Sequence, residues 1–121
     1  MVIAFELDGV ELIALNGGPI FKFNEAVSLS ISCQSQADVD HYWNKLTAGG
    51  TESQCGWLKD KFGLSWQVVP RRLMELLYAG TDPDASRRAF EAMLEMGKID
   101  VATLEAAYVN GERATVGVGT R

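Results

Sequence analysis

The order of the predicted elements assigns this chain to the α+β class. Three β-prone stretches come first, one helix joins the third stretch to a further hairpin, and the chain from Arg71 to about Tyr108 follows a helical pattern. Strand runs joined by one crossover helix, with the other helices gathered at one end, are typical of α+β folds. The length of 121 residues suits one domain. We expect it to span residues 1–109, with 71–109 as a helical extension, and residues 110–121 to form a tail that is either a short strand or disordered.

The first two stretches predict a hairpin. Val2–Asp8 and Val10–Leu15 are apolar and β-prone, and Asp8-Gly9 between them is a strong tight-turn signal. Asn16-Gly17-Gly18-Pro19 then ends the second strand. A phosphate-binding glycine loop must open a helix. Here a proline and an extended aromatic segment follow, so this stretch is interpreted as a turn.

The third stretch, Ala26–Cys33, is the clearest half-buried strand in the chain. Its side chains alternate strictly between two faces. One face is apolar and the other carries only hydroxyls; the two sets are Val27, Leu29, Ile31 and Cys33, and Ser28, Ser30 and Ser32. Because serine is small, its face leaves room above the sheet.

The segment Ser35–Thr47 predicts a helix. Ser35 is a plausible N-cap, and Gly49-Gly50 follows as a stop. The helical spacing indicates a buried stripe of four residues: Val39, Tyr42, Trp43 and Leu46.

A second hairpin is expected from Cys55–Lys59 and Leu64–Val69, around the turn Asp60–Gly63 and ending at Pro70. Its facing strands could place Trp57 and Trp66 together as an aromatic pair, more plausibly in the core than stacked on a ligand. Gln67 would have to find partners if buried, and is the best single candidate for a polar group that lines a pocket.

The helical region contains two clear helix starts. Asp82 with Pro83 predicts a cap followed by proline at the first helical position, and Asp100 can cap a last helix. Gly97 is a candidate C-cap. The apolar side of the helix after Pro83 would be supplied by Ala89, Phe90, Met93, Leu94 and Met96.

Composition excludes several classes of partner. The formal charge of −5 disfavours unspecific binding to nucleic acid or anionic membrane, and the arginine pairs Arg71-Arg72 and Arg87-Arg88 are expected to be solvated. No apolar run approaches the roughly 20 residues of a membrane span. Cys33 and Cys55 have no metal-binding or redox spacing. A cytoplasmic protein with free thiols is expected, although an intramolecular disulfide stays open.

The residues suggest no catalytic centre. A nucleophilic Cys55 would need a base, and the single histidine, His41, lies on a helix beside an apolar pair. One histidine also cannot build a two-histidine, one-carboxylate metal site. The carboxylates that could form an acidic site are expected on solvated faces or turns; they are Glu6, Glu11, Glu25 and Asp60. We therefore assign no catalytic residue, metal ligand or cofactor.

Several stretches together resemble a known family. They are FELDG at Phe5–Gly9, ALNGGP at Ala14–Pro19, the run from Phe23 through SLSISC, the helix DVDHYWNKL before Gly49-Gly50, the block CGWLKDKFGLSWQVVP at Cys55–Pro70, and AMLEMGKIDVATLEAAY. Over about residues 2–108 the chain is similar to the PhnB-like, "3-demethylubiquinone-9 3-methyltransferase domain" branch of the vicinal oxygen chelate superfamily. That superfamily also contains glyoxalases, extradiol dioxygenases and fosfomycin or bleomycin resistance proteins.

The resemblance implies paired βαβββ modules that curl into a cleft, commonly in dimers. The family normally has a strand and a helix before FELDG, so the first module is expected to lack its initial strand and helix. We expect a homodimer, possibly strand- or module-swapped, in which another chain completes that module. In metal-using relatives a glutamate ligand follows the Asp-x-x-Gly turn and a histidine often lies on the earlier strand. Gln67 and Ser28 stand at these places here.

The resemblance favours a small-molecule-binding protein of the glyoxalase or bleomycin-resistance type. Its cleft would be lined by Asn16, Ser28, Trp57, Trp66 and Gln67. The alternative is a metal-dependent lyase, dioxygenase or methyltransferase-like enzyme whose ligands come from elsewhere. A third hypothesis is a dimeric protein without activity of its own. No S-adenosylmethionine loop is present, so the methyltransferase label has no motif to support it.

Overall fold

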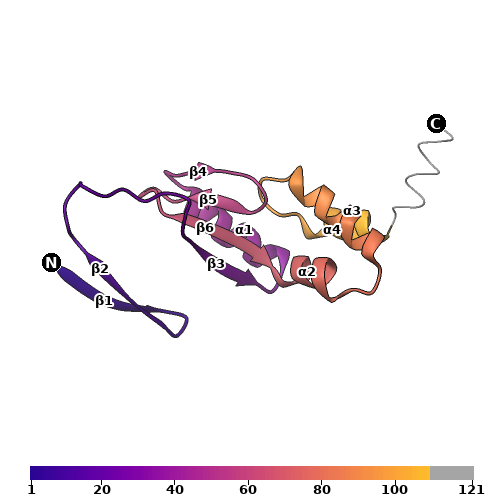
Figure 1. Cartoon of the computed structure of the whole chain (residues 1–121), viewed down its shortest axis with the longest axis horizontal. Helices are drawn as coiled ribbons and strands as arrows, with labels where there is room; N and C mark the ends of the chain where they lie inside the picture. The colour runs from indigo at the N-terminus through magenta and orange to yellow at the C-terminus, as the bar shows by residue number, and fades with distance from the viewer. Residues whose placement is uncertain (110–121) are drawn as a thin grey trace.

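Two separate sheets and a C-terminal group of helices make up the computed structural model, which describes residues 1–109 (Figure 1). The predicted tail, 110–121, lies outside the described residues. A two-stranded sheet at the N-terminus is followed by a four-stranded sheet with one helix, and then by the remaining helices. This arrangement confirms the α+β prediction.

The N-terminal hairpin consists of β1 (Val2–Leu7) and β2 (Val10–Leu15) in antiparallel pairing. Both turn residues, Asp8 and Gly9, adopt positive φ angles of 48° and 84°. This is the backbone that a two-residue hairpin turn needs, and it explains the Asp-Gly signal. The hairpin projects from the rest of the chain (Figure 1), and neither strand packs extensively against another described helix or strand.

The central unit is one complete βαβββ module. It comprises β3 (Ser28–Cys33), α1 (Gln36–Thr47), β4 (Thr51–Glu52), β5 (Trp57–Lys59) and β6 (Ser65–Pro70). The strand order is β3-β6-β5-β4, with β3 parallel to β6 and the other pairs antiparallel. The order confirms the predicted module; the short β4 had no clear signal in the sequence.

Helix α1 covers one face of this sheet. The Ser35 hydroxyl accepts a hydrogen bond from the Asp38 amide at 3.2 Å, as predicted for the N-cap. Beneath the helix lies a core of buried apolar side chains: Cys33, Val39, Trp43, Leu58 and Val68, with Ile31, Leu46 and Trp66 packed against them. Two residues that were predicted to be buried, one on the helix and one on the strand, are not part of this core. Tyr42 is exposed at the edge of the helix stripe, and Val27 precedes the strand and is also exposed.

The β5–β6 hairpin is held by its turn. The Asp60 carboxylate accepts hydrogen bonds from the amides of Phe62 and Leu64, at 2.9 and 3.1 Å. In the strand register Trp57 lies opposite Gln67, and Leu58 lies opposite Trp66. Because alternate residues of a strand face opposite sides, the two tryptophans are on different faces of the sheet. The predicted aromatic pair is therefore wrong.

The chain continues as α2 (Arg71–Met74), a π-helical turn η1 (Glu75–Ala79), α3 (Pro83–Leu94) and α4 (Val101–Val109). Asp82 and Asp100 cap α3 and α4 as predicted. Gly97 is not the C-cap, because α3 ends at Leu94 and Glu95 takes that place. None of the helices within 1–109 is long and apolar enough to cross a bilayer.

The C-terminal helices form a second core. It contains Leu73, Leu76, Ala89, Ile99 and Leu104, with Val69, Leu77, Ala92, Met93, Met96 and Tyr108 packed around them. Two residues expected on the apolar side of α3, Phe90 and Leu94, lie outside this core and are 43% and 46% exposed. Val69 belongs to β6, so this core continues directly from the end of the sheet.

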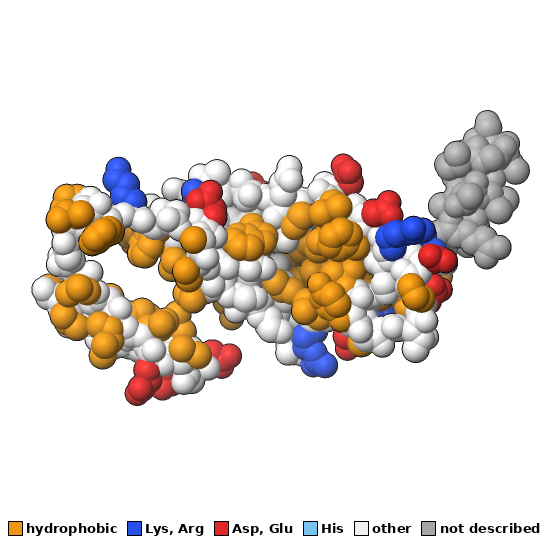
Figure 2. Space-filling view, viewed as in Figure 1, with side chains coloured by type: hydrophobic (Ala, Val, Ile, Leu, Met, Phe, Trp, Pro, Cys, Tyr) orange, Lys and Arg blue, Asp and Glu red, His pale blue; other side chains and the backbone are white. Residues whose placement is uncertain are grey.

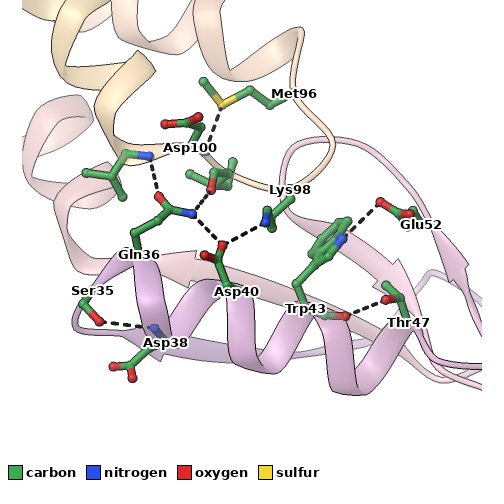
Figure 3. A network of polar contacts seen from close by, with 12 residues as sticks. Ser35, Gln36, Asp38, Asp40, Trp43, Thr47, Glu52, Met96, Lys98 and Asp100 are labelled. Atoms are coloured by element: carbon green, nitrogen blue, oxygen red, sulfur yellow. Dashed lines mark hydrogen bonds and ion pairs between the residues drawn. The ribbon is translucent and has the colours of Figure 1, made fainter.

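Polar contacts join the C-terminal helices to the module (Figure 3). The Gln36 side chain of α1 accepts a hydrogen bond from the Val101 amide at 2.8 Å and donates to the Ile99 carbonyl at 3.0 Å. The backbone amides of Cys55 and Gly56 donate to the carbonyls of Met96 and Gly97, each at 2.8 Å. A Cβ atom on Gly56 would lie 2.9 Å from the Val68 carbonyl oxygen, so only glycine fits at this junction.

Candidate functional site

The face of the sheet opposite α1 brings three of the predicted site residues together. The Gln67 amide nitrogen donates a hydrogen bond to the Ser28 hydroxyl at 2.9 Å. Trp57 lies directly across the hairpin from Gln67 and so points to the same face. The three side chains are half-buried. We call this surface, made by Ser28, Trp57 and Gln67, the open face.

The C-terminal helices cover only one end of that face. Val69 lies two residues after Gln67, on the same side of β6, and packs into the second core. The hydroxyl-bearing end of the face, towards Ser28 and Ser65, has no helix over it. In Figure 1 the sheet lies in front of α1, so the viewer sees the face opposite the helix. In Figure 2, which has the same view, this face is mainly white, and the orange apolar surface of the C-terminal helices lies beside it.

A cavity of about 270 Å³ lies at this uncovered end. It is lined by Glu25, Thr51, Glu52, Ser53, Trp57, Leu58, Lys59 and Ser65. The Lys59 ammonium contacts the Glu25 carboxylate at 3.1 Å. The hydrogen bond from Lys59 holds the pKa of Glu25 below its ordinary value, although the carboxyl group is on the surface. The pocket therefore combines an indole ring with one paired cation.

Ser65 is the unusual member of this lining. Only 1% of its surface is exposed, and its hydroxyl has no hydrogen-bond partner among the described residues. A buried hydroxyl without a partner loses its hydration without replacement, at a cost of roughly 1–3 kcal/mol. Such a group marks a place where a polar ligand atom or a water would stabilise the structure.

Two predicted site residues lie elsewhere. Trp66 points to the α1 side, where its indole nitrogen donates to the Asp60 carboxylate at 2.9 Å and its ring packs against the core. Asn16 follows β2 on the projecting hairpin, and its backbone amide donates to the Met1 carbonyl at 3.0 Å. Of the five predicted site residues only Trp57 lines the cavity; Ser28 and Gln67 lie on the same face of the sheet outside its lining. The structure thus brings Ser28, Trp57 and Gln67 together and leaves Asn16 and Trp66 apart.

The residues on the open face do not fit a metal ion. Gln67 offers a neutral amide, which is a weaker metal ligand than a carboxylate, and its nitrogen is bonded to Ser28. Residues 1–109 contain no group of three His, Cys, Asp or Glu side chains placed to hold an ion. Of the carboxylates considered from the sequence, Glu25 pairs with Lys59, Asp60 holds its turn, and Glu6 faces Glu11 across the projecting hairpin.

The cysteines and arginines have structural surroundings. Both cysteines are free. Burial raises the pKa of the Cys33 thiol, so it stays protonated. Three of the four arginines are exposed as predicted: Arg71 bonds Gln34, Arg72 bonds Glu105, and Arg87 pairs with Asp84 and Glu91. The prediction is wrong for Arg88, which is half-buried and donates to the carbonyls of Ala107 and Tyr108.

The sequence analysis missed six of the residues that line the cavity: Thr51, Glu52, Ser53, Leu58, Lys59 and Ser65. Lys59 and Ser65 could have been predicted from the hairpin, because they lie two residues from Trp57 and Gln67 and alternate residues of a strand share a face. Thr51 could not be assigned to this face from the sequence, because β4 has only two residues and shows no alternating pattern. Glu25 was considered only as a possible metal ligand, and its place beside Lys59 depends on the fold of the loop before β3.

Comparisons with known proteins agree with this fold. A sequence model of the family described as 3-demethylubiquinone-9 3-methyltransferase matches residues 1–69, which include the hairpin and nearly all of the module. The chain is similar to the solved structure of a putative 3-demethylubiquinone-9 3-methyltransferase, PhnB protein, from Bacillus cereus, with 28% identity and a TM-score of 0.54. The match covers 58% of this chain and 64% of that one.

A second solved structure, protein PA1353 from Pseudomonas aeruginosa, is 20% identical with a TM-score of 0.49 over 58% of this chain and 62% of that chain. The matched region thus spans less than two thirds of the length of either solved protein. The search of curated proteins finds no match.

Proposed function

Because the chain belongs to the 3-demethylubiquinone-9 3-methyltransferase family, a PhnB-like branch of the glyoxalase and vicinal oxygen chelate superfamily, we propose that it binds a small organic molecule on the open face of its module. The observation that carries this proposal is the hydrogen bond between Gln67 and Ser28 beside Trp57. It holds a polar group and an aromatic ring side by side on the face of the sheet opposite α1.

The chemistry of these side chains favours a planar ligand with a hydrogen-bond donor. Since the Gln67 nitrogen is engaged with Ser28, its carbonyl oxygen is oriented, and no residue within 1–109 donates to it. An oriented amide oxygen accepts a hydrogen bond without first losing rotamer freedom. The indole of Trp57 offers the apolar surface on which a ring can stack. Ligand pockets typically combine apolar walls with a few placed polar groups in this way.

The proposal is tested by calorimetric titration with quinones, hydroquinones, other aromatic compounds and S-adenosylmethionine. We expect a planar compound to bind, and replacement of Trp57 by Ala to weaken its binding about tenfold, which corresponds to about 1.4 kcal/mol. Gln67→Leu should weaken the binding of hydroquinones, which carry hydrogen-bond donors, more than the binding of quinones. Binding of S-adenosylmethionine alone would favour methyl transfer and contradict the proposal.

Trp66 provides the matched control. It is a tryptophan of the same hairpin on the opposite face of the sheet. Trp66→Phe should leave ligand affinity within about twofold, whereas Trp57→Phe should reduce it. Equal effects of the two substitutions would mean that the ligand does not bind on the open face.

The metal-dependent alternative has its own test. Gln67→Glu would supply the carboxylate that this position lacks, and we expect only weak binding of divalent ions, because no second ligand pair stands beside it in the described region. Metal content and thermal shifts with Mn²⁺, Zn²⁺ and Ni²⁺ check this, using protein purified without a nickel column. Tight stoichiometric binding by the unmodified chain would overturn the metal-free assignment.

We also propose that the protein works in the cytoplasm. Both of its cysteines are unpaired, which suits a reducing compartment. Thiol labelling of freshly lysed cells tests this: both thiols should be found reduced after denaturation, and an oxidised pair would contradict it.

A further inference from the structure

The cavity at the uncovered end of the sheet is a polar site beside the open face. It shares only Trp57 with that face, and Leu58 is its other apolar lining residue. The remaining lining residues all carry hydrogen-bonding side chains: Glu25, Thr51, Glu52, Ser53, Lys59 and Ser65. Pockets for drug-sized ligands begin at about 300 Å³, so a cavity of about 270 Å³ suits a compact ligand of one ring.

Ser65 supplies a polar group that lacks a partner. It lies opposite Lys59 in the strand register and two residues before Gln67, so its side chain is on the side of the sheet away from α1. Its hydroxyl is buried and has no hydrogen-bond partner within 1–109. A hydroxyl both donates and accepts hydrogen bonds. The group that matches it best is therefore another hydroxyl.

Lys59 and Glu25 place a donor beside an acceptor. The Lys59 ammonium lies 3.1 Å from the Glu25 carboxylate, and the two side chains are 39% and 65% exposed. An ammonium group only donates hydrogen bonds, and a carboxylate only accepts them. Two hydroxyls on neighbouring carbon atoms fit such a pair, because one hydroxyl can accept from the ammonium while the other donates to the carboxylate.

Glu52 adds an acceptor whose position is fixed. One of its carboxylate oxygens accepts a hydrogen bond from the Trp43 indole nitrogen at 3.0 Å (Figure 3). The second oxygen can accept a hydrogen bond from a ligand. Thr51 and Ser53, on either side of Glu52 in the chain, contribute hydroxyls to the same lining. The cavity therefore combines several acceptors with several donors.

The charge of the lining disfavours ionic ligands. Two carboxylates and one ammonium leave a net charge of −1, and the ammonium is already paired. An anion would meet Glu25 and Glu52, whereas a cationic amine would meet Lys59. An apolar ligand would remove these polar groups from water without replacing their hydrogen bonds. A neutral ligand rich in hydroxyls satisfies donors and acceptors alike, and the C–H face of its ring can pack on the indole of Trp57.

We propose that this cavity binds a neutral polyhydroxylated ring, such as a monosaccharide. Two neighbouring hydroxyls bind Lys59 and Glu25, a third bonds Ser65, and the ring packs on Trp57. The ring is either a free sugar or the sugar of an aryl glycoside, whose planar part would lie on the open face. Only the glycoside form rests on the proposed function, because a free sugar needs no contact with Gln67.

NMR titration of the full chain with glucose, galactose, mannose, myo-inositol and the phenyl glycosides of the three sugars tests the proposal. At least one of these compounds should bind saturably. Ser65→Ala should weaken its binding about fivefold, because one hydrogen bond is lost. Lys59→Met should weaken it about tenfold, because a charged donor is lost. Circular dichroism checks that the variants stay folded.

Ser32→Ala and Lys61→Met are the matched controls. Both residues are exposed and lie outside the cavity lining, so each substitution should change the affinity by less than about twofold. Equal effects of the test and control variants would overturn the proposal. Tighter binding of inorganic phosphate or ethylamine than of any sugar would also overturn it, since either result would mean that the site selects an ion.

The unmodified chain separates this inference from the proposed function. Binding of sugars without binding of planar compounds would support the inference and contradict only the proposed function. Binding of planar compounds with no saturable binding of any sugar or glycoside would overturn only the inference. Phenyl glycosides that bind more tightly than the free sugars would identify the glycoside form, and equal affinities would identify the free sugar.

Discussion

Ser65 and Gln67 stand two residues apart on the same strand and the same face, and only Gln67 has a side-chain partner. Gln67 bonds Ser28, whereas the buried hydroxyl of Ser65 bonds no described residue. Burial without a partner is unfavourable for folding. A stable fold tolerates one such group when the site gains its partner from a ligand or water, which is consistent with the cavity beside it.

Ser65→Ala should raise the free energy of unfolding of the unliganded protein by about 1 kcal/mol, because it removes a polar group that has no partner. Ser28→Ala should lower it by about 0.5–1 kcal/mol, since it leaves Gln67 without its acceptor. Urea unfolding followed by tryptophan fluorescence measures both changes. A clear loss of stability on Ser65→Ala would show that the hydroxyl is bonded in solution.

The two thiols should differ in reactivity. Cys33 is 1% exposed, and burial raises its pKa, so little thiolate is available for attack. Cys55 is only half-buried. Alkylation by iodoacetamide at pH 8 should therefore modify Cys55 at least tenfold faster, as followed by mass spectrometry of the peptides. Equal rates would mean that the strand carrying Cys33 opens readily.

At the scale of the elements, Gln36 makes the most concentrated contact between α1 and the C-terminal helices. Its amide bonds the Ile99 carbonyl, the Val101 amide and the Asp40 carboxylate, and Asp40 also pairs with Lys98 at 2.8 Å (Figure 3). Two of these partners, the Ile99 carbonyl and the Val101 amide, join α1 to the start of α4, while Asp40 lies on α1 itself. The apolar core around the buried Ile99 lies directly behind this contact.

Gln36→Ala should lower the free energy of unfolding by about 1–2 kcal/mol, because it leaves two backbone groups without partners at a half-buried junction. Gln34→Ala is the control: it is exposed and loses a single bond to Arg71, so its effect should stay within about 0.5 kcal/mol. Chemical denaturation compares the two. A junction that tolerates Gln36→Ala without loss would be held by apolar packing alone.

Local signals predicted most elements, because each depends on neighbours in sequence. The Asp8-Gly9 turn, the Ser35 cap and the Asp82-Pro83 start all appear where the sequence places them. The predictions that failed depend on how a residue is placed relative to elements that are distant in the sequence. Phe90 fits the helical pattern, yet no described element covers it, and β4 is too short to show alternation.

The candidate site was predictable only in part for the same reason. Gln67 and Ser28 are 39 residues apart, and their contact depends on the parallel register of β3 and β6. The family resemblance suggested these two positions, whereas the residues alone singled out Gln67. Trp66 was placed in the cleft that the family resemblance implies, although the residues alone favoured a core position, and the structure packs it against the core on the α1 side.

At the scale of the whole molecule, stability should fall on the acidic side of neutrality. Hydrogen bonds from Lys59 and Lys98 hold the pKa values of Glu25 and Asp40 below their ordinary values. The unfolded chain, whose carboxyl groups titrate near pH 4, therefore binds more protons than the folded chain in this range. The stabilisation by these pairs is present above about pH 4 and is lost as the pH falls through the lower folded values.

The melting temperature should accordingly drop between pH 5 and pH 3, and Asp40→Asn should make this drop smaller, because the substituted side chain no longer titrates. Since both carboxyl groups are at the surface, 1 M NaCl should also reduce the difference between the two proteins. Scanning calorimetry at several pH values measures the effect. An unchanged acid profile in Asp40→Asn would assign the loss to other carboxylates.

The backbone bonds from Cys55 and Gly56 to Met96 and Gly97 have a practical consequence for work on this protein. The family model matches residues 1–69, but these backbone bonds attach the segment after α3 to the start of β5. Versions of the protein that end after β6 would expose Val69 and would lose the backbone hydrogen bonds to Met96 and Gly97. Such versions should precipitate or unfold over a broad temperature range. Crystallisation and labelling projects should therefore retain the sequence through Val109.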